Sequence, residues 1–565
     1  MTEHSSLGER LVAEGHLTAE QLRTAVQEER QGRGSLHKVL VARRLVPADV
    51  VAASLAEEVG LPFVRLSDFT VEAEVLKLVP EELCRRHRIF PLFRIGSALT
   101  VATAEPSDIL ALDQAKRASG LEVDAVVATE EEILEALDHH HGTRGTIAEL
   151  IRGIDFRGLG LEDERGVSPE RLANVAEVVP VVKLVNALIA SAVSERASDI
   201  HIEPDEDVVR VRIRVDGLLR EAVTLPKPLQ SAVISRVKIL SDLDIADSRV
   251  PKDGRFRFTV NDRDVDLRVS TFPTIYGENV VLRLLDKSVG LMRLEDLGFS
   301  EEMLVEYRRA IARPHGLLLV TGPTGSGKTT TLYATLAILN TPDKNIITIE
   351  NPVEYQLAQV RQSQVNPKAG LTFASGLRSI LRQDPDIIMV GEIRDLETAQ
   401  TAVQAALTGH LVLTTLHTND AVGAITRLVD MGVEPFLIAS SVVGVMAQRL
   451  VRTICSRCKQ PYVASPQLRA LLGIHEGKGP LTFYRGKGCQ YCRDSGYRGR
   501  VGIFEFLTIS DRLRELVLPK GAAAELKRAA LGEGMRDLRI DGILKATRGL
   551  TSIEEVLRIT QADGG

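Results

Sequence analysis

A glycine-rich loop carries the first chemistry that this sequence suggests. Residues 322–329 read GPTGSGKT and fit the pattern G-x-x-x-x-G-K-[ST] at every position. The apolar run LLLV precedes the loop and the helical pattern TTTLYATLAIL follows it, which is the context that a phosphate-binding loop requires. In such a loop backbone N–H groups face the phosphates, a lysine reaches the β- and γ-phosphates, and a hydroxyl ligates Mg²⁺. The sequence therefore predicts a site for ATP and Mg²⁺, with Thr329 as the magnesium ligand. The residues expected at this site are Gly322, Pro323, Thr324, Gly325, Ser326, Gly327, Lys328, Thr329 and Thr330.

Acids and a histidine follow three other apolar runs. Glu350 and Glu354 come after the run IITI. Glu392 follows DIIMVG, and His417 follows HLVLTTL. A single acid at the end of a strand is often only solvated. Three such tips beside a phosphate loop are what hydrolysis needs, because Mg²⁺ must be held, water polarised and the γ-phosphate sensed. Asp386 stands before its run, so we assign the acid that usually ends this strand to Glu392.

The cysteines form a second chemical group. Four of the five lie in two C-x-x-C pairs, and Cys84 stands alone. Four thiolates in two pairs suit a tetrahedral Zn²⁺ ion, and a closed site of this kind is structural. Redox-active dithiols are the alternative. We expect zinc, with the ligands Cys455, Cys458, Cys489 and Cys492.

The runs that precede the acids and the histidine predict the element that positions them. Between about 300 and 450, apolar runs alternate with helical segments, and LLLVTG, NIITIE, DIIMVGE and HLVLTTLH are typical of buried parallel strands. Ligands of such a sheet bind at the carboxyl ends of its strands. We therefore expect an α/β domain with an open sheet. The stretch 438–447 is also apolar, but it is too short to span a membrane and rich in small residues.

The segment upstream predicts an α+β domain. Residues 208–217 alternate strictly, with valines and an isoleucine on one face and three arginines on the other. Further strands are expected at 254–260, 264–271 and 279–286. Nearer the N-terminus, 99–108 predicts a strand and a turn, and 131–142 predicts a helix that stops at Gly142.

The first 60 residues contain a degenerate repeat with an offset of 29 residues. The equivalent positions are apolar and lie at helical spacings, which predicts a duplicated helical unit that buries its own face. They are Leu7, Leu11, Val12, Leu17, Leu22 and Val26 in the first copy and Leu36, Leu40, Val41, Val46, Val51 and Leu55 in the second.

Length and composition limit the remaining possibilities. A chain of 565 residues is too long for one core and predicts three or four domains. The net charge of −6 argues against a surface that clamps nucleic acid, which would be basic. The N-terminus does not have the pattern of a signal peptide, and no apolar run reaches the roughly 18–20 residues needed to cross a bilayer. We expect a cytoplasmic protein that reaches the inner membrane only through partners.

These patterns divide the chain into seven expected segments. They are an N-terminal helical repeat module (1–60), the α+β part of an N1 domain (61–145), a linker (146–174), an N2 domain (175–298), a RecA-like ATPase core (299–450), a tetracysteine zinc subdomain (451–502) and a C-terminal helical region (503–565).

Together the motifs resemble those of the secretion ATPase superfamily, in the GspE/PilB group, and most closely its type II secretion branch. The resemblance rests on ASDIHIEP, RIRVDG, the phosphate loop, ENPVEY, LRQDPDIIMVGEIRD, TGHLVLTTLHTNDA, the tetracysteine and GYRGRVGIFE. It implies a RecA-like P-loop ATPase that assembles into a homohexamer, with arginines that approach the bound phosphates. The matching positions are Arg268, Arg283, Arg378 and Arg382, and a surface salt bridge is the alternative for each. Asn351 departs from the family, which more often has aspartate there.

The N-terminal repeat resembles the MshEN-like module that binds cyclic di-GMP in some relatives. That module begins each repeat with R-L-G, whereas this chain has SLG at 6–8 and SLH at 35–37. Arg44 replaces the second late glycine. These departures argue against cyclic di-GMP binding and favour docking to inner-membrane platform proteins of the GspL/GspF kind.

The leading hypothesis is a hexameric motor that drives pseudopilus assembly in type II secretion. The nearest alternative is extension of a type IV pilus by the same kind of motor. A nucleic-acid translocase disagrees with the mild acidity and with the absence of tryptophan for base stacking. A regulatory nucleotide sensor without ATPase activity disagrees with the intact Lys328, Glu392 and His417.

Overall fold

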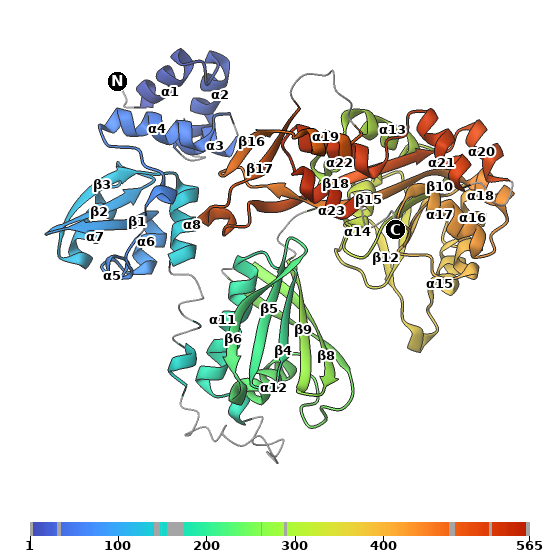
Figure 1. The fold of residues 1–565 in the computed structure, drawn as a ribbon, viewed down its shortest axis with the longest axis horizontal. Coiled ribbons are helices and arrows are strands. Elements are labelled where there is room, and N and C mark those ends of the chain that lie inside the picture. Colours follow the sequence, from blue (N-terminus) through green and yellow to red (C-terminus); the bar gives the residue numbers. More distant parts are fainter. Residues whose placement is uncertain are drawn as a thin grey trace. The chain divides into compact units, whose positions relative to one another are not determined.

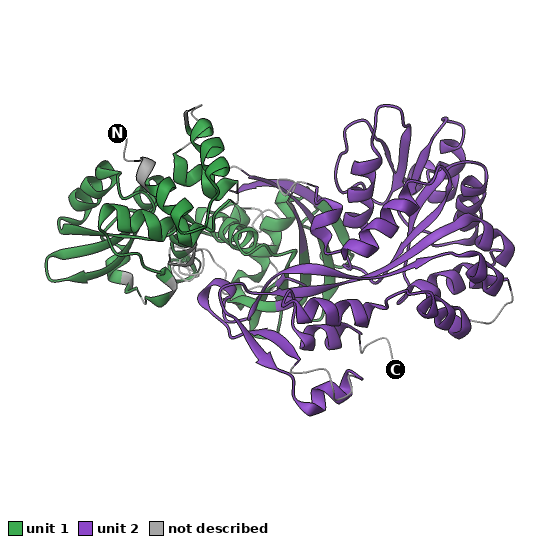
Figure 2. Ribbon diagram, turned by 90° about the horizontal axis from the view of Figure 1, so that it is seen from above, with its two compact units in different colours: residues 1–213, 220–254, 269–281 green, residues 214–219, 255–268, 282–565 purple. Residues whose placement is uncertain are grey.

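The structure divides the chain into two compact units. A computed structural model describes residues 4–30, 35–43, 45–69, 71–140, 147, 150–154, 174–260, 263–286, 291–473, 481–518 and 523–560. One unit comprises residues 1–213, 220–254 and 269–281, and the other comprises residues 214–219, 255–268 and 282–565 (Figure 2). This division differs from the segments expected from the sequence, so those boundaries stay a prediction. The expected linker falls outside the described residues except at 147, 150–154 and 174.

Four helices at the N-terminus follow the predicted repeat. They are α1 (His4–Ala13), α2 (Ala19–Arg30), α3 (Leu36–Ala42) and α4 (Ala48–Val59). Helix α3 starts about one repeat length after α1, and α4 starts the same interval after α2. Their shared core includes Leu7, Leu11 and Leu17 together with Leu36, Leu40 and Val46. The prediction of a helical unit that buries its own apolar face is confirmed.

A small α+β module comes next in the chain. It contains the strands β1 (Ile89–Ile95), β2 (Ala98–Thr103) and β3 (Glu122–Val127) and the helices α5 (Ala73–Leu76), α6 (Glu81–His87), α7 (Ile109–Ser119) and α8 (Glu130–His140). Strand β2 pairs antiparallel with β1 and parallel with β3. The strand expected at 99–108 and the helix expected at 131–142 are both present, although Gly142 lies outside the described residues.

A six-stranded sheet follows, in the order β6-β5-β4-β9-β8-β7 (Figure 1). The strands are β4 (Asp199–Pro204), β5 (Val208–Val215), β6 (Leu218–Pro226), β7 (Lys252–Val260), β8 (Arg263–Thr274) and β9 (Gly277–Asp286). The accompanying helices are α11 (Val179–Ser194) and α12 (Gln230–Leu240). Val209, Val211 and Ile213 are buried on β5, as the alternation of the sequence predicted.

The second sheet has seven strands in the order β12-β11-β13-β14-β10-β15-β18. They are β10 (Gly316–Thr321), β11 (Ile346–Glu350), β12 (Arg361–Gln364), β13 (Ile387–Val390), β14 (Leu411–Leu416), β15 (Val442–Ile454) and β18 (Tyr497–Thr508). All neighbours pair in parallel except β15 and β18. The four predicted parallel strands are confirmed as β10, β11, β13 and β14. The apolar stretch 438–447 becomes the end of a helix and the start of β15.

Helices cover both faces of this sheet, because its strands are apolar on both sides. Leu317 and Leu319 point into one core and Leu318 and Val320 into the other. The helices of the first core are α15 (Phe373–Ile380), α16 (Leu396–Leu407), α17 (Ala421–Asp430), α18 (Pro435–Ser441), α20 (Asp511–Val517) and α21 (Ala523–Gly532), and those of the second are α13 (Glu301–Ile311) and α14 (Lys328–Leu339). The expected RecA-like α/β architecture is confirmed.

The remaining elements surround the cysteines. Strands β16 (Lys459–Val463) and β17 (Thr482–Gly486) form an antiparallel pair. The helices here are α19 (Pro466–Leu471), α22 (Leu538–Thr547) and α23 (Ile553–Thr560). A small core that includes Phe483, Ala546 and Ile553 joins them. Among the described residues, the structure contains no helix that is long and apolar enough to cross a membrane.

Candidate active site

The predicted phosphate loop connects β10 to α14 and has the backbone geometry that its glycines allow. Gly322, Gly325 and Gly327 all have positive φ angles, of 147°, 77° and 91°. Side chains rarely adopt such values, so these positions favour glycine. The hydroxyl of Ser326 is buried without a hydrogen-bond partner in the described part of the chain. A buried polar atom inside a loop of this shape fits a site that a polar ligand completes.

Lys328 lies at the first position of α14 and is 9% exposed. Its Nζ donates to the carbonyl oxygens of Gly322, at 2.7 Å, and Pro323, at 3.1 Å, so the side chain folds back over the loop. Burial lowers the pKa of Lys328 to about 8, while the charge of Glu392 raises it and that of Arg449 lowers it. The hydroxyl-bearing Thr329 beside it is exposed, so it is accessible to the predicted magnesium ion.

Glu350 ends β11 and is only 3% exposed. The hydroxyls of Tyr333 and Thr348 each donate to its carboxylate at 2.5 Å, and Gln362 donates at 3.2 Å. Burial and the nearby charge of Glu350 raise the pKa of Tyr333, so the phenol remains a donor. These bonds give Glu350 a fully hydrogen-bonded buried position at the end of the strand.

Glu354 lies four residues further on and forms an ion pair with Arg268 of β8. Both oxygens of Glu354 accept hydrogen bonds from the guanidinium, at 2.8 and 3.2 Å. A bidentate pair of this kind fixes the orientation of both side chains. Arg268 therefore contacts the acidic segment after β11 in this chain. Arg283, the other predicted arginine of this region, is exposed on β9.

Glu392 and His417 come together, as their positions after neighbouring strands predicted. The His417 Nε2 lies 3.5 Å from one carboxylate oxygen of Glu392, and the Arg394 guanidinium lies 2.6 Å from the other. The Glu392 side chain is 14% exposed and that of His417 is 49% exposed. The hydrogen bond to Glu392 raises the pKa of Arg394. Asp386 instead binds the backbone N–H of Asn345 at the opposite end of β13.

Hydroxyl groups hold these strand ends together. Thr321, the last residue of β10, accepts a hydrogen bond from the backbone N–H of Thr418 at 2.9 Å, and the two hydroxyls lie 2.7 Å apart. The Thr415 hydroxyl donates to the carbonyl of Gly391 at 2.7 Å. The residues just before and after these contacts are the phosphate loop, Glu392 and His417. The carboxyl edge of the parallel sheet therefore gathers the predicted groups.

Three contributors were not predicted from the sequence. Arg394 pairs with Glu392, and two neighbours on β15, Gln448 and Arg449, lie beside the phosphate loop. Arg449 is 5% exposed and donates to the backbone carbonyl and side-chain oxygen of Asn419, two residues after His417. The polar pair Gln-Arg inside the apolar run VVGVMAQRLV is the signal that could have identified the two β15 residues.

Arg378 and Arg382 lie on and just after α15 and are exposed. Arg378 forms an ion pair with Glu397 of α16, and Arg382 donates to the backbone carbonyl of Arg378 at 2.9 Å. These contacts are with the neighbouring helix and with α15 itself. Their predicted role at the nucleotide therefore remains a prediction.

The four predicted zinc ligands form a cluster. Their sulfur atoms all lie within 4.8 Å of one another, and the closest pairs are 3.6 to 3.8 Å apart. A tetrahedron with Zn–S bonds of about 2.3 Å has edges of about 3.8 Å. The arrangement therefore fits a closed tetrahedral site, in which the ion would join the two C-x-x-C turns.

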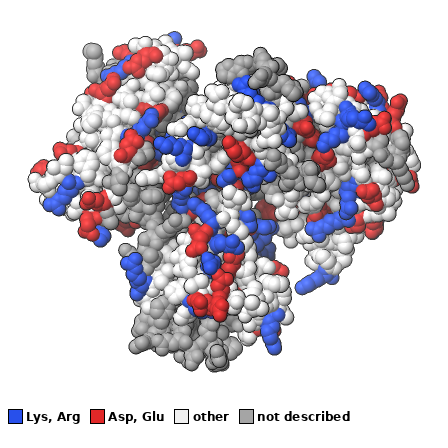
Figure 3. Space-filling view, in the orientation of Figure 1, with Lys and Arg blue, Asp and Glu red and all other residues white. Residues whose placement is uncertain are grey.

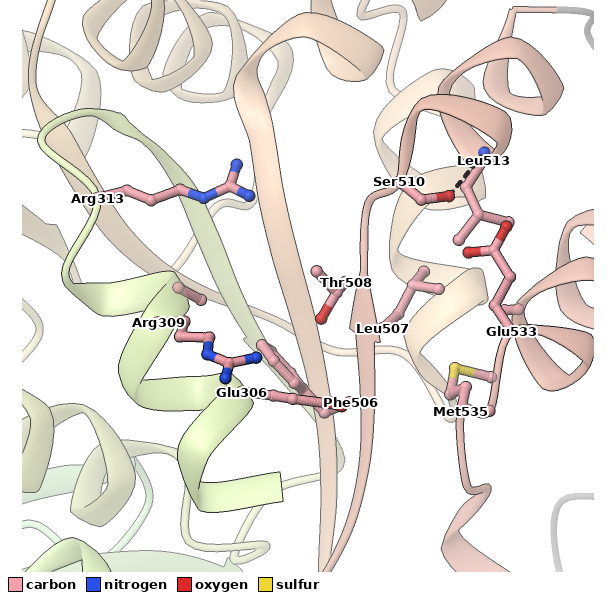
Figure 4. Close-up of a pocket in the computed structure, with 13 residues that line it drawn as sticks. Glu306, Arg309, Arg313, Phe506, Leu507, Thr508, Ser510, Leu513, Glu533 and Met535 are labelled. Atoms are coloured by element: carbon pink, nitrogen blue, oxygen red, sulfur yellow. Dashed lines mark hydrogen bonds between the residues drawn. The ribbon is translucent and has the colours of Figure 1, made fainter. Parts of the chain in front are cut away.

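The structure also contains a cavity of about 340 Å³ away from these groups (Figure 4). Helix α13 supplies Arg309 and Arg313 on one side, and Glu533 and Met535 follow α21 on the other. Phe506 of β18 also lines it. None of the lining residues belongs to the predicted site.

Comparisons with known proteins agree with this geometry. The family model described as type II/IV secretion system protein matches residues 174–558, and the MshEN domain model matches residues 59–147. The latter match lies downstream of the repeat at 1–60 in which we expected the likeness. The chain is 45% identical over 561 residues to the type IV pilus assembly ATPase PilB of Myxococcus xanthus, covering 99% of both chains. It is 47% identical over 461 residues to the type II secretion system protein E of Pseudomonas aeruginosa, covering 81% of this chain and 91% of that one. The structure of the Legionella pneumophila ATPase DotB resembles 71% of this chain and 98% of its own length, with a TM-score of 0.50 and 22% identity, which supports the fold.

Proposed function

The chain belongs to the type II/IV secretion system protein family and is an ATP-hydrolysing motor enzyme, and on that basis we propose that it powers pseudopilus assembly for protein export by type II secretion. The observation that carries this proposal is the 47% identity to a type II secretion protein E over the segment that contains the whole ATPase site.

Extension of a type IV pilus is the second candidate. The match to a pilus assembly ATPase spans 99% of both chains and so includes the N-terminal modules. These modules are where a motor would contact the rest of its machine, and a match there favours a pilus. Both candidates use the same ATPase site and differ only in the fibre that is assembled.

A nucleic-acid translocase has less support. The net charge is −6, and the face drawn in Figure 3 shows acidic and basic side chains interspersed. Proteins that move along nucleic acid need a basic groove that follows the phosphate backbone.

The site residues have proposed roles that follow from their contacts. The phosphate loop and Lys328 bind the phosphates, and the Thr329 hydroxyl holds Mg²⁺, which would neutralise charge on the phosphates. Glu392 polarises the attacking water, with His417 beside it to sense the γ-phosphate. Arg268 is delivered to the nucleotide from its pairing with Glu354. The four cysteines hold a structural Zn²⁺.

We further propose a cytoplasmic homohexamer that reaches the inner membrane through platform proteins. The module at 1–60 would dock to them rather than bind cyclic di-GMP. The match of the MshEN model to residues 59–147 makes nucleotide titration of the full chain a direct check of that part.

Deletion of the gene in its own organism tests the proposal. The expected result is loss of protein export into the medium with surface pili retained, and rescue by the wild-type gene but not by Lys328→Ala. Loss of pili with normal export would identify the second candidate. Normal export and normal piliation would contradict both.

A further inference from the structure

The side chain of Gln448 lies against the phosphate loop, although the loop motif does not include it. Ala447 of β15 is paired with Thr321, the last residue of β10, so the register places the next residue at the point where β10 turns into the loop. The Gln448 side chain is 2% exposed. A buried amide is costly unless its donor and acceptor are both satisfied, so its partners indicate what it does.

Both polar atoms of this amide bind the segment around Lys328. Its Nε2 donates to the backbone carbonyl of Ser326 at 2.7 Å. Its Oε1 accepts from the hydroxyl of Thr331 at 2.8 Å. Ser326 is in the loop and Thr331 is in the first turn of α14, so one side chain connects the loop to the helix that it opens.

The loop backbone packs against Gln448 closely enough to require two of its glycines. A Cβ atom at Gly327 would lie 2.9 Å from the Gln448 Nε2, and one at Gly322 would lie 2.5 Å from the Gln448 backbone oxygen. Contacts this short do not occur with a real Cβ atom. The close approach of Gln448 is therefore a second reason, besides positive φ, for glycine at these positions.

The bond to Ser326 also fixes the direction of a loop donor. The carbonyl of Ser326 and the N–H of Gly327 belong to one planar trans peptide and point in opposite directions. Because the carbonyl points to Gln448, the N–H of Gly327 points away from it. Rotation of this peptide plane would break the bond at 2.7 Å and leave the buried amide unpaired.

We propose that Gln448 is a positioning residue of the ATPase site, which holds the loop in the conformation that accepts the phosphates shared by ATP and ADP. It acts on the nucleotide only through the loop backbone. The proposal concerns ATP hydrolysis itself and holds whichever fibre the motor assembles.

The test is the variant Gln448→Met in the full chain, which keeps the length of the side chain and removes both hydrogen bonds. We expect the KM for ATP and the Kd for a fluorescent ADP analogue to rise about tenfold each, the usual effect of losing a buried hydrogen bond. We expect kcat to stay within about threefold, because a loop that holds phosphates equally in ground and transition states contributes uniform binding. Gln460→Met, on the exposed strand β16, is the matched control.

A second variant removes one partner without changing β15. Thr331→Val should raise the KM and the Kd for ADP in the same direction, and Thr331→Ser, which keeps the hydroxyl, should raise them less. A lower kcat at unchanged KM and unchanged ADP affinity, together with a lower Tm, would show that Gln448 supports only the fold. That result, or wild-type kinetics for Gln448→Met, would overturn the proposal.

Discussion

Glu392 has a carboxylate that contacts a histidine on one oxygen and an arginine on the other. The substitution Glu392→Gln keeps the shape of this side chain and removes its charge. We expect ADP and ATP binding to persist and kcat to fall by about 10²–10⁴-fold, the usual contribution of a general base. Steady-state ATPase assays and titration with a fluorescent ATP analogue measure the two properties separately.

The exposed Glu525→Gln on α21 is the control for this substitution, because it removes the same charge far from the sheet edge in sequence. Loss of nucleotide binding in Glu392→Gln would contradict the assigned role and make Glu392 a structural residue.

Lys328 predicts a pH dependence of nucleotide binding. Burial lowers its pKa to about 8 in the free protein. Above that pH the ammonium loses its proton in the free protein, and binding of an anionic nucleotide must restore it. The affinity for ADP should therefore be constant well below pH 8 and fall by up to about tenfold per pH unit above it. Isothermal titration across this range measures the effect.

Lys328→Arg stays charged throughout the same range and serves as the comparison. Its weaker binding should show no decline between about pH 7 and 9.5, where an arginine remains protonated. A wild-type affinity that is flat over the same interval would show that Lys328 keeps its proton.

At the scale of elements, hydrophobic runs and motifs predicted the sheet that carries the site. The loop, β11, β13 and β14 were recognisable because each joins an apolar run to a distinctive polar tip. Strand β15 was not recognised, because its run VVGVMA was read only as a membrane segment that is too short. Its place between β10 and β18 depends on contacts far apart in the sequence. Gln448 and Arg449 were missed with it.

The arginines show the same limit. Their sequence positions resemble those of family arginines, but a sequence pattern does not show which anion an arginine contacts. In this chain Arg268 binds Glu354 and Arg378 binds Glu397. The cysteine cluster was predictable, because metal ligands are recognised by residue type and spacing alone.

The cysteine cluster predicts a metal content of about one Zn²⁺ per chain, from the four-thiolate geometry. Elemental analysis of fresh, reduced protein measures it. Cys455→Ser should lower the metal content and expose the subdomain of β16 and β17 to protease, because three ligands bind zinc less tightly than four. Cys84→Ser, at a buried cysteine outside the cluster, is the control. Metal-free wild-type protein with intact subdomain packing would contradict the zinc site.

At the scale of the whole molecule, the ion pair between Arg268 and Glu354 predicts an effect of assembly. An arginine that neutralises a glutamate is not available to the phosphates, and ring formation would provide the rearrangement that delivers it. We expect the ATPase activity per chain to rise with protein concentration, since an arginine supplied to phosphates accelerates transfer by roughly 10³–10⁵-fold in other systems. Specific activity and light scattering over one dilution series measure both variables.

Arg268→Ala should flatten this rise without changing the oligomer size. The matched control is Arg263→Ala, which removes an exposed arginine from the same strand. Constant activity from monomer to hexamer would mean that one chain already contains a complete site.

Strand β15 gives the motor domain a stiff internal rod. Gln448, against the phosphate loop, and Cys455, in the cysteine cluster, are seven residues apart on one extended segment, a span of roughly 23 Å. The pairing with β18 runs from Gly444 to Ile454 and leaves no slack between these points. An extended chain that is clamped in this way transmits a push or pull along its axis with little loss. The nucleotide and the metal therefore load opposite ends of the same lever, and neither end can slide along that axis without moving the other.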